Sequence, residues 1–62
     1  MDGYATERPV ILIVEDEFLI RAATADVIRE AGFEVLEAAN ADDALVLLEG
    51  RGDIRVVFTD IQ

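Results

Sequence analysis

The sequence contains no cysteine, no histidine and no lysine. Without cysteine, neither a disulfide framework nor a thiolate metal site can form. A mechanism that needs an imidazole or a lysine ammonium must obtain it from another molecule or from sequence outside this segment. Long apolar runs are also missing, because the run that begins at Val10 ends at Val14. This run is too short for a membrane span or for the apolar region of a signal peptide, so we expect a cytoplasmic protein.

Positive charge is scarce. Five arginines stand against fourteen acidic residues, and the formal net charge is -9. Such a balance repels phosphate backbones and anionic lipid headgroups, which argues against direct contact of this segment with nucleic acid or a membrane. Hydrophobic residues make up 53% of the chain and charged residues 31%, a composition typical of a small packed domain rather than a disordered tail.

Segments with the apolar pattern of strands alternate along the chain with segments that have the apolar pattern of helices. Residues 1–8 are predicted to be a flexible lead-in to one domain over residues 9–62. The continuous aliphatic run 10–14 is typical of a strand that is covered on both faces. A helix that begins at Glu15 and ends before Gly32 is predicted next, followed by an edge strand over 33–38. A second helix is capped by Asn40 and stopped by Gly50, and a last strand covers 54–59. The order β-α-β-α-β predicts an α/β fold with a parallel sheet.

Each predicted helix has an apolar stripe that we expect to face the sheet. The stripe of the first helix is Ile20, Ala23, Val27 and Ala31, and the stripe of the second is Ala41, Ala44, Leu45 and Leu48. The arginines fall outside these stripes, and we expect them to be solvated.

Carboxylates follow two of the predicted strands. Glu15 and Asp16 come just after the first strand, and Asp60 comes just after the third. Ligands of open α/β sheets bind outside the carboxyl ends of the strands. If the first and third strands are neighbours, Asp16 and Asp60 face one another across a crevice. Facing carboxylates without a local cation suit a hard divalent ion such as Mg²⁺.

The segments ILIVEDE and VVFTD, with the pattern between them, resemble the N-terminal half of a response-regulator receiver domain. The resemblance covers residues 9–62 and implies strand order 2-1-3, the first half of a doubly wound flavodoxin-like fold. It puts Glu15 and Asp16 on the acidic pair of that family and Asp60 on its phosphoacceptor. It also implies that Asp16, Asp60 and the backbone carbonyl of Gln62 hold Mg²⁺, with Glu15 bound through water.

The resemblance implies a role in two-component signal transduction. Asp60 would accept a phosphoryl group from a sensor histidine kinase or a phosphotransfer protein, as a phosphoacceptor in a relay rather than a turnover enzyme. The absence of histidine agrees, since the donor imidazole belongs to the partner. A receiver also uses a hydroxyl residue after its fourth strand and a lysine after its fifth. Both are missing here, so we expect phosphorylation to be impaired.

Other interpretations stay open. Asp16 and Glu17 could simply favour a helix N-terminus, and Asp60 could be an ordinary polar strand end. A different functional class is a non-catalytic half-domain that pairs with itself or with another chain. A haloacid-dehalogenase-like phosphatase fragment ranks last, because that family has a second aspartate where Gln62 stands. The sequence names neither the cognate kinase nor an output domain.

The third predicted strand, 54–59, has apolar side chains on both faces. The chain stops two residues after Asp60, which looks like a truncation within the predicted site. We expect this strand to be an exposed edge that pairs with a second copy and gives a homodimer. The alternative is a poorly ordered chain that awaits its other half.

Overall fold

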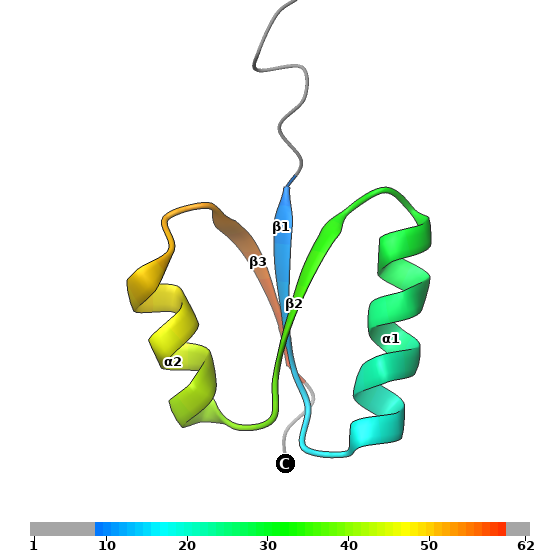
Figure 1. The fold of residues 1–62 in the computed structure, drawn as a ribbon, viewed down its shortest axis with the longest axis horizontal. Coiled ribbons are helices and arrows are strands. Elements are labelled where there is room, and N and C mark those ends of the chain that lie inside the picture. The colour runs from blue at the N-terminus through cyan, green and yellow to red at the C-terminus, as the bar shows by residue number, and fades with distance from the viewer. Residues whose placement is uncertain (1–8, 60–62) are drawn as a thin grey trace, which may run out of the picture.

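A computed structural model describes residues 9–59, in which three strands alternate with two helices (Figure 1). The three strands are parallel and lie in the order β2-β1-β3, so the predicted α/β class and strand order are confirmed. The elements are β1 (Val10–Val14), α1 (Phe18–Glu30), β2 (Glu34–Ala38), α2 (Ala41–Gly50) and β3 (Ile54–Thr59).

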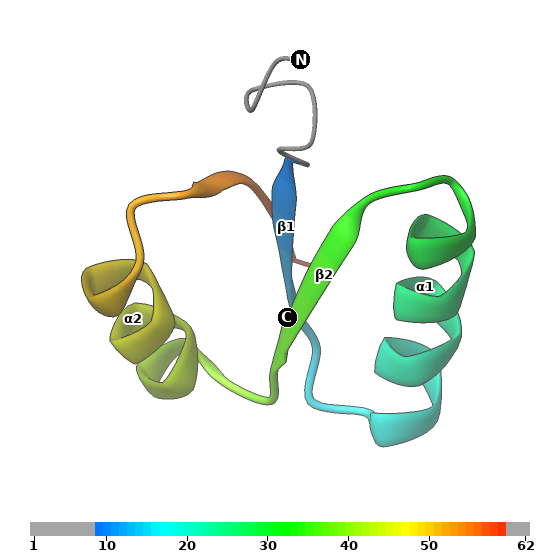
Figure 2. The same ribbon diagram turned by 45° about the horizontal axis from the view of Figure 1, so that its top comes forward.

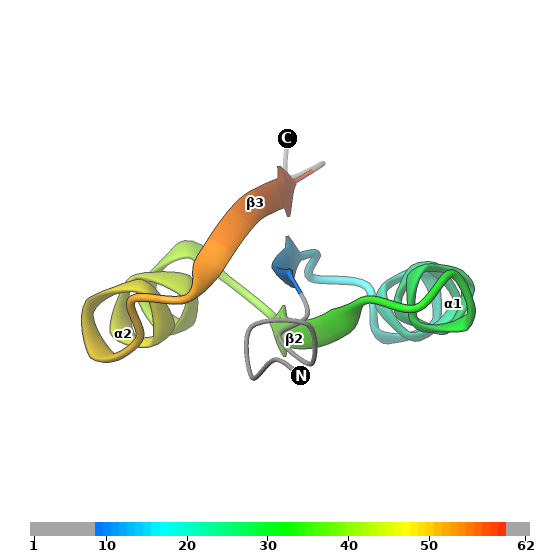
Figure 3. The same cartoon turned by 90° about the horizontal axis from the view of Figure 1, so that it is seen from above.

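The helices lie on opposite sides of the sheet, and β1 passes between them (Figure 2). The view from above shows the same three layers (Figure 3). Leu12 and Val14 pack with Ala44 on the α2 side, while Ile13 packs with Ala25 on the α1 side. Because β1 has a strand on each edge and a helix on each face, its unbroken aliphatic sequence can be buried from all directions.

The ends of both helices follow from local hydrogen bonding. Asn40 caps α2 as predicted, because its side-chain oxygen accepts the Asp43 N–H at 2.8 Å. Gly32 follows α1 with φ of +103°, in the region that disfavours side chains, and its N–H donates to the Arg29 carbonyl at 2.9 Å. Neither helix within residues 9–59 is long and apolar enough to cross a membrane.

Three predicted boundaries move. Helix α1 begins at Phe18 rather than at Glu15, because residues 15–17 form the turn that leaves β1. Strand β2 begins at Glu34, one residue later than predicted. Gly50 is the last residue of α2 instead of the residue beyond it.

The predicted apolar stripe of α1 is wrong. Ile20 and Val27 are 51% and 68% exposed, whereas Ala25 is fully buried. The helix turns Arg21, Ala25 and Arg29 toward β2, where the two guanidinium groups meet a carboxylate. The prediction assumed that only apolar residues face the sheet. In α1 the arginines of ion pairs also face it, so the predicted face differs from the observed one.

The stripe of α2 is also corrected. Ala44 is buried and Leu47 packs against the core, but Leu45 is 54% exposed and Leu48 lies at the surface. Ala41 is exposed as well. Apolar residues occur around most of this short helix, so its sequence does not single out one face.

Candidate functional site

The turn between β1 and α1 contains three consecutive acids, Glu15, Asp16 and Glu17. It lies at the carboxyl end of the sheet, next to the end of β3, because Val14 of β1 is the register partner of Thr59 of β3. The site predicted from the sequence would lie at this edge.

Glu15 is buried, with only 8% of its surface exposed. Its backbone N–H donates to the Ala38 carbonyl at 3.0 Å, which continues the pairing of β1 with β2. One oxygen of its carboxylate, Oε2, accepts the Glu17 N–H at 3.0 Å. Among residues 9–59 this N–H is the one donor to the carboxylate. The other oxygen accepts no hydrogen bond from residues 9–59.

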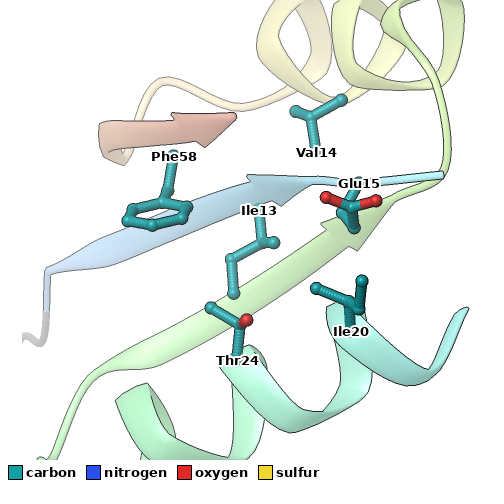
Figure 4. A pocket seen from close by; sticks show the side chains of 6 residues that line it. All are labelled: Ile13, Val14, Glu15, Ile20, Thr24 and Phe58. Carbon is teal, nitrogen blue, oxygen red and sulfur yellow. The ribbon is translucent and has the colours of Figure 1, made fainter. Parts of the chain in front are cut away.

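A hollow of about 210 Å³ adjoins Glu15 between β1, α1 and β3 (Figure 4). Most of its wall is apolar, and its polar side chains are the Glu15 carboxylate and the Thr24 hydroxyl. Its lining residues are Ile13, Val14, Glu15, Ile20, Thr24 and Phe58.

A guanidinium holds the turn from the helix side. Arg21 donates from Nη1 to the Glu15 carbonyl oxygen at 2.7 Å, and its Nε lies 3.4 Å from Glu37 Oε1. The Phe18 ring lies 5.5 Å from the guanidinium carbon, in cation–π geometry. The Arg21 side chain is only 15% exposed, so the prediction that the arginines are solvated is wrong for this residue.

Arg29 completes the group by donating to Glu37 Oε2 at 3.1 Å. Sequence reasoning missed this cluster, although a signal existed. Arg21 and Arg29 are two helical turns apart on one face. Glu37 is the register partner of Ile13, so it lies on the side of the sheet that α1 covers.

A second ion-pair cluster lies at the opposite end of the strands. Arg51 binds Asp53 through two hydrogen bonds of 2.9 and 2.7 Å, and it reaches Glu34 at 3.6 Å. The hydrogen bond from Arg51 lowers the pKa of the Asp53 carboxyl. This cluster joins the starts of β2 and β3 and is remote from the β1–α1 turn.

The predicted site residues fall in two groups. Glu15 and Asp16 lie together in the turn, where Asp16 is exposed and its carboxylate has no partner among residues 9–59. Asp60 and Gln62 lie outside the described residues. Within the described part of the chain, no three His, Cys, Asp or Glu side chains are arranged so that they could hold a metal ion. The magnesium site therefore stays a prediction.

Comparisons with family models, curated proteins and solved structures found no match for this chain.

Proposed function

We propose that this chain is the N-terminal half of a receiver domain of the two-component type, with Asp60 as phosphoacceptor. The observation that supports this most is the parallel order β2-β1-β3. It sets the turn with Glu15 and Asp16 beside the end of β3, the strand that Asp60 follows in the sequence. The same proposal implies the first half of a doubly wound flavodoxin-like fold, a cytoplasmic location, and a histidine kinase or phosphotransfer protein as partner.

The residues of this edge fit a hard cation. Asp16 offers an exposed carboxylate, and the buried Glu15 has one oxygen without a donor among residues 9–59. With Asp60 and the Gln62 carbonyl they would form an all-oxygen set, which Mg²⁺ prefers. Asp16, Asp60 and Gln62 would bind the ion directly and Glu15 through water. When bound, Mg²⁺ would neutralise the charge of the phosphoryl oxygens.

The transfer itself is a displacement at phosphorus. A carboxylate oxygen of Asp60 attacks the phosphorus of a phosphohistidine on the partner, and an oxygen–phosphorus bond forms as the phosphorus–nitrogen bond breaks. The imidazole nitrogen keeps the electron pair of the broken bond and takes up a proton. No lysine is present in the chain to pair with the phosphoryl oxygens, so we expect this transfer to be slow.

Incubation with acetyl phosphate tests the proposal. We expect the wild-type chain to gain one phosphoryl group slowly, only with Mg²⁺, as measured by intact mass. Asp60→Asn should abolish labelling, because an amide is not a competent nucleophile in this role. Asp16→Ala should reduce it by weakening the hold on the ion.

Asp42→Asn is the matched control, because Asp42 is an exposed acid in the first turn of α2. It should be labelled like the wild type. Labelling of Asp60→Asn at the wild-type rate would contradict the proposal.

A second candidate is a non-catalytic module that pairs through β3. It is favoured by the exposure of Val56, Val57 and Phe58, which are 50%, 45% and 51% exposed. An edge strand of this kind can pair with another chain. Association without any Mg²⁺-dependent labelling of Asp60 would favour this candidate over the first.

A further inference from the structure

We infer that Arg21 is a positioning residue that fixes the β1–α1 turn and thereby sets the direction of Asp16. The consequence for Mg²⁺ rests on the proposed function, whereas the effect on the turn does not. Arg21 is the described residue that joins α1, β2 and the turn through one side chain. Its role follows from three features of the contacts.

The first feature is the atom that Arg21 binds in the turn. Its Nη1 donates to the backbone carbonyl of Glu15 at 2.7 Å, and not to the carboxylate. This carbonyl and the N–H of Asp16 belong to one planar peptide unit. A guanidinium that fixes the carbonyl therefore also fixes the plane from which the Asp16 side chain departs.

The second feature is that the remaining polar groups of Glu15, apart from one carboxylate oxygen, are also hydrogen-bonded. Its N–H is bound to Ala38, and its Oε2 accepts the Glu17 N–H. Asp16 has no side-chain partner of its own among residues 9–59. Its position in the turn is therefore determined by its neighbours. Two contacts from outside the turn hold Glu15 among residues 9–59: the Ala38 carbonyl of β2 and the Arg21 side chain of α1.

The third feature is that Arg21 is itself held in place. Glu37 pairs with its Nε at 3.4 Å, the Phe18 ring covers the guanidinium, and 15% of the side chain is exposed. A charge-assisted hydrogen bond from a guanidinium fixed in this way is stronger than one from a mobile surface side chain. The hydrogen bond to the turn and the ion pair with Glu37 lie in different directions, which suits the planar fork of arginine.

Arg29 provides a matched control within the same cluster. It also pairs with Glu37, at 3.1 Å, but its other contacts are a hydrogen bond to the Val35 carbonyl and an ion pair with Asp26, and none reaches the turn. Arg21→Met and Arg29→Met each remove one guanidinium from Glu37 and retain an unbranched apolar side chain. A role of Arg21 confined to its ion pair with Glu37 predicts similar effects of the two changes on the turn.

The test measures the solvent exchange of backbone amides by NMR in the whole chain. The Glu17 N–H reports on the turn, and the Asp43 N–H, bound by the Asn40 cap, is the reference. We expect Arg21→Met to raise exchange of the Glu17 amide about tenfold or more and to leave the Asp43 amide unchanged. Arg29→Met should change neither by more than about twofold. Equal acceleration of the Glu17 amide in both variants would overturn the inference.

Two further measurements separate positioning from stability. Arg21→Lys keeps a cation next to Glu37, so thermal stability should recover while exchange of the Glu17 amide stays fast. Titration with MgCl₂ should show weaker binding to Arg21→Met than to Arg29→Met. Absence of Mg²⁺ binding by the wild-type chain would count against the proposed function, and the amide exchange would still decide the role of Arg21.

Discussion

At the scale of single residues, three of the four arginines within residues 9–59, Arg21, Arg29 and Arg51, have more than one partner each. Arg21 binds Glu37 and a backbone carbonyl, and Arg51 binds Asp53 and Glu34. Sequence reasoning predicted that Glu15 and Asp16 follow β1, because strand ends are marked by the end of an apolar run. It missed the contacts of Arg21, because a prediction from apolar periodicity treats every charged residue as exposed to solvent.

The Arg51–Asp53 pair gives a prediction about pH. The hydrogen bond from Arg51 lowers the pKa of Asp53 below its ordinary value of 3.8. A lowered folded-state pKa contributes stability above the ordinary pKa and loses it as the pH falls through the folded value. Side-chain NMR titration should therefore show a midpoint for Asp53 below 3.8.

Arg51→Gln is the control for this titration. It removes the charge and the paired hydrogen bonds, so the midpoint of Asp53 should rise toward the ordinary value. An unchanged midpoint in Arg51→Gln would show that Arg51 does not cause the shift.

At the scale of elements, the prediction succeeded where the local sequence determines the structure. The run 10–14 defines β1, Asn40 caps α2, and Gly32 takes the positive φ that follows α1. The strand order was not derivable from these signals, since it depends on long-range pairing and came from a family resemblance. The predicted buried faces of the helices were wrong, because α1 and α2 expose more large apolar side chains than they cover.

The cap of α2 gives a prediction about stability. Asn40→Ala removes the acceptor of the Asp43 N–H and should lower the free energy of unfolding by about 1 kcal/mol. Asn40→Asp keeps an acceptor and adds a negative charge at the helix N-terminus, so it should be at least as stable as the wild type. Urea unfolding followed by circular dichroism measures both. A loss of equal size in both variants would mean that the side-chain oxygen does not cap the helix.

At the scale of the whole molecule, the two helices pack mainly on β1 and β2 and leave β3 open. Both core clusters are centred on these two strands, and Ile54 is the β3 residue that packs against one of them. On α1, Leu19 and Ile20 are also exposed, at 76% and 51%. Exposed apolar surface of this extent in a small chain is typical of interaction surfaces.

The prediction at this scale is self-association through β3. Among the described strands β3 has a neighbour on one side, β1, and its exposed apolar side chains suit strand pairing with a second copy. We expect sedimentation velocity to show a mass that rises with concentration. Val57→Lys should weaken this association, because a charge on an edge strand opposes pairing.

Val46→Lys is the matched control, since Val46 is also an exposed valine, 68% exposed on α2, and the change in net charge is the same. General repulsion between chains of net charge -9 would be relieved equally by the two lysines. A selective loss of association in Val57→Lys therefore assigns the contact to β3. A compact monomer at every concentration, or equal behaviour of the two variants, would exclude pairing through this strand.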